Sequence, residues 1–207
     1  MKVYGHPIST CTRKVLTALA EKGEKPEFVT VDIMKGDGKT PDHLARQPFG
    51  RVPAIDDDGF QLFESRAIVR YIDETRGGTK LHGSDPKTRA LVEQWVSVET
   101  SEFTGPAMKI IYQTFFYPMM GKPTDDAVVQ ENRAILEKVC GVMEKQLEKT
   151  EYLAGGTFTV ADISFMPYVD YLHAGKQGDL FDKFPKIKAW WQRVSDRASW
   201  KTATGKA

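Results

Sequence analysis

The sequence has few cysteines, no long apolar run and almost no excess of charge of either sign. Only two cysteines, Cys11 and Cys140, occur in 207 residues, which is too few for a disulfide scaffold. No stretch of about 18 apolar residues is present, so no membrane-spanning helix is predicted. The 29 Lys and Arg are nearly balanced by 28 Asp and Glu. This balance gives no electrostatic support for a nucleic-acid partner or an acidic membrane surface.

The remaining composition is typical of a folded protein. Hydrophobic residues make up 41% of the chain and charged residues 28%. The length allows two small domains, each with its own core. Residues 1–5 enter a strand pattern at once and leave no room for a signal peptide. Together with the low cysteine count, this favours a reducing compartment, so we expect a cytoplasmic location.

The first part of the chain alternates strand and helix patterns. Strands are predicted at residues 2–4, 27–33, 49–55 and 60–63, and helices at 12–22, 41–47 and 66–75. The first two strands flank a helix, which favours a parallel pairing, and the turn at 56–59 favours an antiparallel hairpin. We therefore predict a mixed four-stranded sheet with flanking helices.

The pattern changes after this helix. Residues 76–85 are rich in Gly and Lys without apolar periodicity and are predicted to form a linker. Helical patterns then run through 86–117, 124–149, 159–174 and 185–197, and no strand pattern follows. Thr159 and Asp162 have the spacing of a helix capping box, which indicates a structural role. The sequence thus predicts an α/β domain over residues 1–78 and an all-α domain over 86–207.

Several polar residues of the first domain are candidates for a binding site at one edge of the sheet. Ser9 lies between a strand and a helix, as either a helix N-cap or a binding hydroxyl. Glu64 and Ser65 open the helix after the last strand. A helix N-terminus with a hydroxyl suits a carboxylate and an acidic side chain suits an ammonium, so this pair fits an amino-acid-like ligand. Lys39 and Arg51 are either surface charges or ligands of a second carboxylate.

Pro53 lies within a predicted strand, although proline lacks the amide that a sheet needs. It therefore belongs at an edge of the sheet or in a special turn. A cis Val52–Pro53 peptide bond would turn the Val52 N–H and C=O outward, where an extended peptide can pair with them.

The segments around these residues resemble those of the cytosolic glutathione S-transferases. They are Gly5-His6-Pro7-Ile8-Ser9, Pro48-Phe49-Gly50-Arg51-Val52-Pro53-Ala54 and Phe63-Glu64-Ser65-Arg66-Ala67-Ile68. The second half resembles the same family through residues 102–108, 118–121, 152–156 and 161–163. The pattern favours the serine-type phi class over related classes, and the resemblance covers nearly the whole chain.

The resemblance implies a thioredoxin-like α/β domain, an all-α second domain, a cis Pro53 and a homodimer. It places the catalytic serine at Ser9. The implied glutathione-binding positions are Ser9, Lys39, Arg51, Val52, Pro53, Glu64 and Ser65. Two positions depart from the phi pattern, because Gly38 stands where His is frequent and Arg51 where Gln is usual. Both lie near the expected site of the glycine carboxylate of glutathione, where the charge of Arg51 is one way to replace the missing donor.

The activity implied by the resemblance is conjugation of the glutathione thiolate to hydrophobic electrophiles, and glutathione peroxidase activity is left open. A free thiol with a pKa near ~8.5 is only about 3% thiolate at neutral pH. Lowering its pKa by about two units needs ~2.7 kcal/mol. A hydrogen bond from the Ser9 hydroxyl and the positive end of the following helix can supply this. Glutathione would be a co-substrate, and we expect no cofactor and no metal.

The electrophile needs an apolar surface beside the sulfur. Met108, Tyr112 and Phe115 recur at helical spacing and suit such a surface. A stripe of this kind also suits a core or an interface, so both interpretations stay open. Arg66 and Glu99 are a further candidate pair, which would join two subunits across a twofold axis.

Two other functions fit parts of the sequence. Cys11 lies two residues beyond Ser9, near the catalytic cysteine of thiol-using relatives, so a glutathione-dependent thiol transferase is the alternative enzyme. A buried, inert cysteine is the simpler interpretation, and no Cys-x-x-Cys motif supports dithiol chemistry. A non-enzymatic glutathione- or ligand-binding protein would keep the same fold. The presence of Ser9, Glu64 and Ser65 argues against it.

Overall fold

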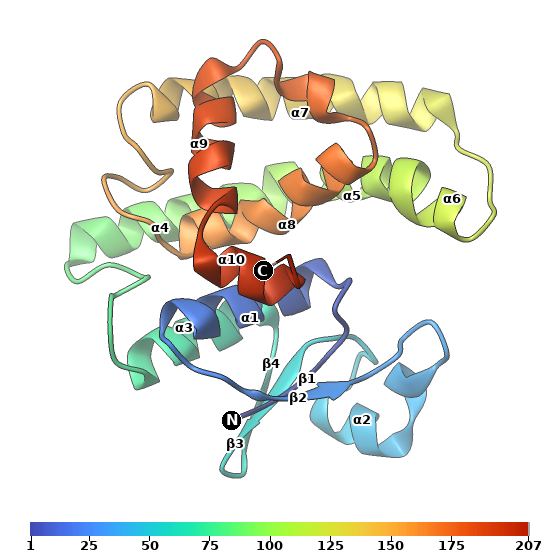
Figure 1. Ribbon diagram of the computed structural model, residues 1–207, viewed down its shortest axis with the longest axis vertical. Coiled ribbons are helices and arrows are strands. Elements are labelled where there is room, and N and C mark those ends of the chain that lie inside the picture. The colour runs from blue at the N-terminus through green and yellow to red at the C-terminus, as the bar shows by residue number, and fades with distance from the viewer. Residues whose placement is uncertain (207) are drawn as a thin grey trace. The chain divides into compact units, whose positions relative to one another are not determined.

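The computed structural model describes residues 1–206, which form two compact units (Figure 1). The first unit comprises Met1–His82 and the segment from Asp196 onward, and the second comprises Gly83–Ser195. The break after residue 82 lies within the predicted linker. The predicted all-α domain over 86–207 differs from the structure, because its last segment packs with the first unit.

A mixed four-stranded sheet forms the centre of the first unit, as predicted. Its strands are β1 (Lys2–Gly5), β2 (Glu27–Thr30), β3 (Ala54–Asp57) and β4 (Phe60–Phe63). The strand order is β2-β1-β3-β4, with β1 and β2 parallel and the other two pairings antiparallel. Val3, Ala54 and Ile55 are completely buried and anchor the sheet in its core.

Two strands are shorter than the sequence patterns predict. The predicted strand 27–33 ends at Thr30. The predicted strand 49–55 begins only at Ala54, because Pro53 has no N–H to donate to a ladder. The Val52–Pro53 bond is cis, which confirms the expectation from the family resemblance.

Four helices belong to the first unit. They are α1 (Thr10–Glu21), α2 (Pro41–Arg46), α3 (Ser65–Thr75) and α10 (Ala198–Thr204). Figure 1 shows α1 and α3 side by side, and the two helices are in contact. A short 3₁₀ helix, Asp37–Lys39, lies between β2 and α2.

Helix α10 was not predicted as a separate element. It packs on α1, where the Glu21 carboxylate accepts hydrogen bonds from Nε and Nη2 of Arg197, each at 2.7 Å. Glu21 also accepts a hydrogen bond from the Ser199 hydroxyl. Trp200 is almost completely buried. These contacts, rather than local periodicity, attach the end of the chain to the first unit.

A buried ion pair fixes the end of the predicted linker that lies in the first unit. The Lys22 Nζ is 2.6 Å from an Asp73 carboxylate oxygen, and neither side chain is exposed. Asp73 also accepts the amides of Leu81 and His82 at 2.7 and 3.0 Å. Burial alone would raise the pKa of Asp73, but Lys22 and these amides hold that pKa below its usual value.

The second unit is helical, as predicted. Its α-helices are α4 (Pro86–Val98), α5 (Thr104–Ile111), α6 (Tyr117–Met119), α7 (Asp126–Leu147), α8 (Val160–Ala174) and α9 (Pro185–Ser195). A short 3₁₀ helix, Gly178–Phe181, precedes α9. None of the helices in residues 1–206 is both long and apolar enough to cross a membrane.

The single helix predicted over residues 86–117 is interrupted twice by π-helical turns. These turns are Glu99–Phe103 and Tyr112–Phe116. Each lies just before a proline, Pro106 or Pro118. Because proline lacks an N–H and its ring clashes with the carbonyl of the preceding turn, a wider turn relieves the conflict without ending the helix.

Asp162, at the start of α8, organises the second unit from a completely buried position. Its carboxylate accepts the Thr159 amide at 2.9 Å, which confirms the predicted structural role of the capping box. It also accepts the Leu153 amide at 3.0 Å and the Trp190 indole N–H at 2.8 Å. Burial raises the pKa of Asp162, and the three N–H donors oppose that rise.

Candidate functional site

The register of the sheet gathers most of the predicted site residues at one end of the first unit. Tyr4 pairs with Ala54, and Ala54 pairs with Phe63. Because β3 runs antiparallel to both neighbours, the end of β1, the start of β3 and the end of β4 share one edge. The residues just beyond these strand ends are Ser9, Val52, Pro53, Glu64 and Ser65.

Ser9 is the N-cap of α1. Its Oγ accepts the Thr12 amide at 3.2 Å, and its own amide donates to the His6 carbonyl at 2.9 Å. Since the oxygen acts as an acceptor for the helix, the hydroxyl proton is left to donate to a ligand. The two interpretations of Ser9 are therefore compatible, because one hydroxyl can cap the helix and bind an anion at its positive end.

Ser65 begins α3 and is 3% exposed. Within residues 1–206 its Oγ has no hydrogen-bond partner. Such a buried hydroxyl costs about 1–3 kcal/mol unless a polar group binds it. Its place beside the unpaired amides of the α3 N-terminus suits an anionic group.

Glu64 precedes this helix with a φ of 71°, a left-handed conformation that is unfavourable for a residue with a side chain. Its carbonyl accepts the first helical hydrogen bond, from the Ile68 amide at 2.9 Å. The Glu64 side chain is exposed. A strained residue of this kind is characteristic of binding sites, where the backbone aims a side chain at a ligand.

Val52 supplies backbone groups at the same edge. In the described part of the chain neither its N–H nor its C=O is hydrogen-bonded. The residue as a whole is 8% exposed. An extended peptide that lies along this edge of the sheet would pair with both backbone groups.

Two residues that the sequence interpretation missed hold the turn before Val52. The Gln47 side-chain oxygen accepts the Phe49 and Arg51 amides at 2.8 and 3.0 Å. His43, on α2, places its Nε2 2.7 Å from the Arg51 carbonyl oxygen. Both side chains are buried. No local pattern distinguishes these two polar residues from surface residues of a short helix.

Lys39 and Arg51 are exposed and lie on two turns that touch through glycines. A Cβ atom on Gly38 would lie 2.5 Å from the Gly50 carbonyl oxygen, and one on Gly50 would lie 2.9 Å from the Gly38 carbonyl oxygen. Position 38 therefore has no room for a side chain in this backbone. This explains the departure from the histidine that is frequent in phi enzymes, and it brings the turns with the two cations into contact.

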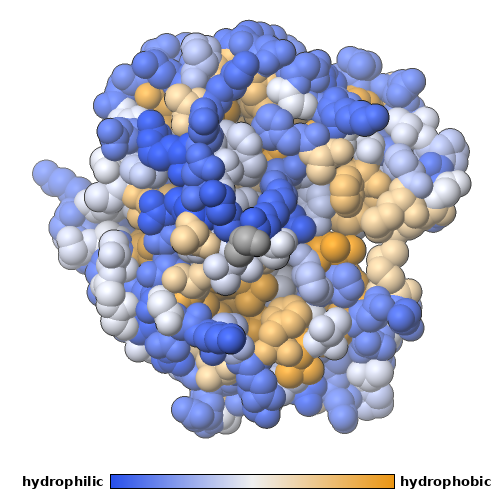
Figure 2. Space-filling model, viewed as in Figure 1, coloured by the Kyte–Doolittle hydropathy of each residue, from blue (hydrophilic) through white to orange (hydrophobic). Residues whose placement is uncertain are grey.

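The three candidate residues for the electrophile site belong to the second unit. Met108 is half-buried on α5, and Tyr112 is 45% exposed in the following π turn. Phe115 packs against the rings of Phe116 and Tyr171, with centroids 5.3 and 4.9 Å apart, so it also serves the core. Figure 2 shows apolar side chains on the visible face near α6, where Met119 and Met120 are exposed.

The predicted pairing of Arg66 with Glu99 of a second subunit is wrong. Glu99 is completely buried within its own chain. Its carboxylate accepts a hydrogen bond from the Thr104 hydroxyl. A carboxylate in this position is not on a surface that a second subunit can reach.

The two cysteines differ in environment. Cys140 on α7 is buried, and this burial raises the pKa of its thiol to about 12. It therefore stays protonated and unreactive. Cys11 is half-buried in the first turn of α1, so of the two thiols it is the one a ligand could reach.

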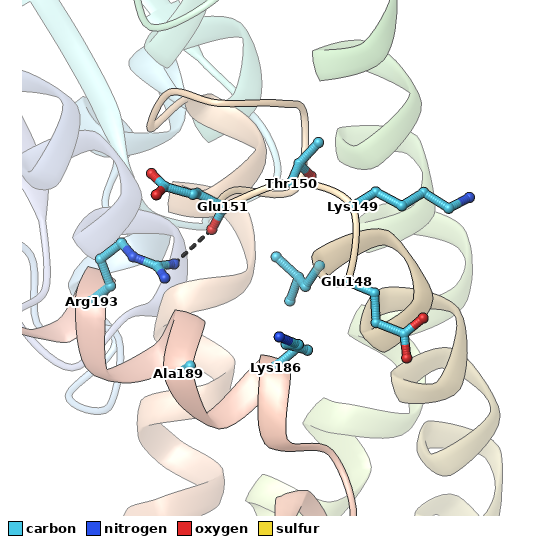
Figure 3. Close-up of a pocket in the computed structure, with 8 residues that line it drawn as sticks. Glu148, Lys149, Thr150, Glu151, Lys186, Ala189 and Arg193 are labelled. Atoms are coloured by element: carbon cyan, nitrogen blue, oxygen red, sulfur yellow. Dashed lines mark hydrogen bonds between the residues drawn. The ribbon is translucent and has the colours of Figure 1, made fainter.

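A cavity of about 300 Å³ lies in the second unit, between the end of α7 and α9 (Figure 3). None of the predicted site residues lines it. Arg193 of α9 points toward Glu151 and donates to its carbonyl oxygen at 2.7 Å. The lining carries charges of both signs, which gives this cavity no preference for one class of ligand.

Comparisons with known proteins agree with the geometry. The family model for the glutathione S-transferase N-terminal domain matches residues 1–74, and that for the C-terminal domain matches residues 107–198. Glutathione S-transferase F10 from Arabidopsis thaliana is 39% identical over 204 residues, which are 97% of this chain and 94% of the relative.

Two solved structures show the same likeness. Glutathione transferase F2 from Populus trichocarpa has a TM-score of 0.94 at 41% identity, covering 99% of this chain and 97% of that one. Glutathione S-transferase I from mais (maize), in complex with an atrazine glutathione conjugate, has a TM-score of 0.91 at 35% identity. That match covers 99% of this chain and 96% of the other.

Proposed function

The chain belongs to the glutathione S-transferase family and conjugates glutathione to electrophiles, and on that premise we propose that Ser9 stabilises the reacting thiolate. The observation that carries the proposal is a set of polar groups at one end of the sheet that find no hydrogen-bond partner within residues 1–206. They are the buried Ser65 hydroxyl and the Val52 N–H and C=O. Glutathione is a tripeptide with two carboxylates and an ammonium. Its carboxylate and main-chain groups can form hydrogen bonds with all of these groups.

Each part of glutathione has a matching group. The γ-glutamyl carboxylate binds Ser65 and the α3 N-terminus, and Glu64 accepts from the ammonium. The backbone of Val52, held beside the cis Pro53, pairs with the cysteinyl main chain. Lys39 and Arg51 attract the glycine carboxylate.

With the tripeptide held in this way, the sulfur lies beside Ser9. The Ser9 hydroxyl donates to the thiolate, and the positive end of α1 adds ~0.3–1 kcal/mol. A hydrogen bond to a charged group contributes a further ~1.5–3 kcal/mol. The sum matches the ~2.7 kcal/mol that a two-unit lowering of the thiol pKa requires. Glutathione is a substrate in this mechanism, and no other cofactor takes part.

The electrophile binds on the apolar surface of the second unit. Met108 and Tyr112 contribute directly, whereas Phe115 supports them through its ring contacts.

Of the other predicted assignments, we retain a cytoplasmic homodimer. The 67% exposed ring of Phe49, which packs edge-on to Phe63, is an apolar contact available to a second subunit. Light scattering of the wild type and of Phe49→Ala tests the dimer.

Substitution of Ser9 tests the assignment of the thiolate. We expect Ser9→Ala to bind glutathione but to lose about 25-fold in kcat/KM for an aryl halide at pH 7, since a two-unit rise in the thiol pKa returns the thiolate fraction to about 3%. The ultraviolet absorbance of the bound thiolate, titrated against pH, should show its pKa rising toward that of free glutathione. Ser9→Thr, which keeps a hydroxyl and a helix cap, is the control.

The variant Cys11→Ser distinguishes the proposed glutathione transferase from the alternative, a thiol transferase that uses Cys11. It should leave conjugation unchanged within about twofold, as expected of a change away from the proposed thiolate donor. If Cys11→Ser instead abolished turnover while Ser9→Ala retained it, the assignment to Ser9 would be overturned. A disulfide-reduction assay on the same variants would then identify a thiol transferase.

A further inference from the structure

We infer that His43 is a positioning residue for glutathione, because it orients the peptide unit between Arg51 and Val52. The inference rests on the proposed function, in which the Val52 N–H pairs with the cysteinyl part of the tripeptide. His43 touches neither the sulfur nor the electrophile. It acts through the carbonyl group that shares a peptide bond with that N–H.

The hydrogen bond shows which nitrogen of the ring acts as a donor. His43 is 2% exposed, and its Nε2 lies 2.7 Å from the Arg51 carbonyl oxygen. A carbonyl oxygen only accepts, so Nε2 carries the proton in this contact. The other ring nitrogen, Nδ1, is buried without a hydrogen-bond partner in residues 1–206. The contact therefore requires a proton on Nε2.

The Arg51 carbonyl and the Val52 N–H belong to one planar peptide unit. A donor that fixes the carbonyl also fixes the direction of the N–H. Withdrawal of electron density by the donor makes the same N–H a stronger donor toward a ligand, because hydrogen bonds in a chain polarise one another. His43 thus supplies both the orientation and the polarity that the tripeptide needs at Val52.

The surroundings of Arg51 leave Val52 as the group open to a ligand. On the other side of Arg51, its amide already donates to the Gln47 side chain at 3.0 Å. Both polar backbone groups of Arg51 are therefore occupied by buried side chains, one from His43 and one from Gln47. The Val52 N–H and C=O, one residue later, are not hydrogen-bonded in the described chain.

A role limited to packing does not account for the histidine. The unpartnered Nδ1 is unfavourable in a buried position, and an apolar side chain would fill the same space without it. What the apolar side chain would lose is the donor to Arg51. His43 is therefore a buried ring with one unpartnered nitrogen, and its other nitrogen donates to the peptide unit that carries the Val52 N–H of the proposed glutathione site.

The matched variants His43→Met and His43→Gln test this role. Both side chains are unbranched and of similar length, but only Gln carries an N–H₂ that can replace the Nε2 donor. We expect His43→Met to weaken glutathione binding about tenfold, measured by calorimetry and as KM, the factor typical of one well-placed hydrogen bond. The kcat at saturating glutathione and the KM for the electrophile should change less than about twofold. His43→Gln should recover binding to within about threefold.

Three outcomes overturn the inference, and they are distinguishable from a failure of the proposed function. If the wild type itself does not bind glutathione in the calorimeter, the proposed function and the inference both fail. If the wild type binds and His43→Met binds equally well, His43 alone loses its role. If His43→Met and His43→Gln lose affinity and thermal stability equally, the residue is structural and the positioning role is wrong.

Nuclear magnetic resonance provides a readout on a protein that keeps His43, so it does not depend on whether His43→Met and His43→Gln fold. The chain has four histidines, so the ¹⁵N shifts of His43 can be assigned by single substitution of the other three. We expect Nε2 to show the ¹⁵N shift of a nitrogen that carries a proton, and its N–H signal to change further when glutathione is added. An Nε2 without a proton, or an Nε2–H signal that glutathione leaves unchanged, would contradict the inference.

Discussion

The buried carboxylate of Asp162 in the second unit accepts three N–H groups, whereas the buried hydroxyl of Ser65 in the first unit has no partner in residues 1–206. The first arrangement is complete within the protein. The second is incomplete until a ligand binds, and the Val52 N–H and C=O at the same end of the sheet are also not hydrogen-bonded in the described chain. The difference teaches that a buried polar group serves stability where its partners are internal and binding where they are not.

The largest expected effect tests the complete arrangement. Asp162→Ala leaves the Leu153, Thr159 and Trp190 donors buried without an acceptor. We expect a loss of about 3–5 kcal/mol in the free energy of unfolding, since each orphaned donor costs ~1–3 kcal/mol. Chemical denaturation followed by tryptophan fluorescence measures it. Molecules that remain folded should keep the wild-type KM for glutathione within about twofold.

The control for this change is Asp162→Asn, which keeps one acceptor oxygen. Its loss should be smaller than that of Asp162→Ala. If both variants had the same midpoint denaturant concentration as the wild type, the three hydrogen bonds to Asp162 would not stabilise the second unit as the geometry indicates.

The next largest effect tests the unpartnered hydroxyl of Ser65. It compares Ser65 with Ser199, a second buried serine of the first unit. Ser65→Ala removes a buried hydroxyl that has no partner in residues 1–206, so the free energy of unfolding without glutathione should rise by about 1–3 kcal/mol. The KM for glutathione should rise about 10–100-fold, as expected for a lost hydrogen bond to a charged group. Ser199→Ala removes a hydroxyl bonded to Glu21, so it should lower stability by about 1–2 kcal/mol and leave KM unchanged. The reverse assignment of these two effects would break the comparison.

A smaller effect concerns the ion pair that attaches α10. Burial alone would raise the pKa of Glu21, but Arg197 and Ser199 hold it below its usual value. A carboxylate with a lowered folded pKa stabilises the protein above its unfolded pKa of ~4.3 and loses that contribution as pH falls through the folded pKa. Glu21→Gln should therefore cost about 1–2 kcal/mol at pH 7, with the difference from wild type shrinking below about pH 4. A difference that stayed constant down to pH 3 in denaturation experiments would contradict this.

The smallest effect is expected at the exposed rim of the site. Arg51→Gln should raise the KM for glutathione about threefold at low ionic strength, and the difference should disappear near ~1 M salt because exposed charges are screened. Lys35→Gln, which removes an exposed cation from a neighbouring loop, is the matched control and should leave the KM for glutathione unchanged. A salt-independent change at Arg51 would indicate a shape effect rather than the attraction of a carboxylate.

Much of the fold could be predicted because its signals are local. The hairpin turn at 56–59 and the helix start at Thr159 and Asp162 depend on side chains a few positions apart. The ends of the elements were less predictable where a proline intervened. Pro53 delays β3 and Pro106 follows a π turn, and in both cases the missing amide determines the geometry.

The site was predictable as a set of residue types but not as a set of partners. Ser9, Glu64 and Ser65 were identified from their positions next to strands and helix starts. His43 and Gln47 were missed because their acceptor and donors lie on a turn that follows the helix. The glycine at position 38 is explained only by the tertiary structure, in which the Gly50 carbonyl leaves no room for a side chain.

The sequence by itself determined the strands and helices, the polar residues available at the sheet edge, and the family to which they point. Tertiary structure alone decided which of those polar groups have partners. Glu21 and Arg197 are separated by 176 positions, whereas the Ser65 hydroxyl and the Val52 backbone have no hydrogen-bond partner among residues 1–206. The physical reason is that periodicity reports on neighbours within one turn of helix or one step of strand. Hydrogen bonds between distant segments depend instead on sheet register and helix packing, which the whole chain sets together.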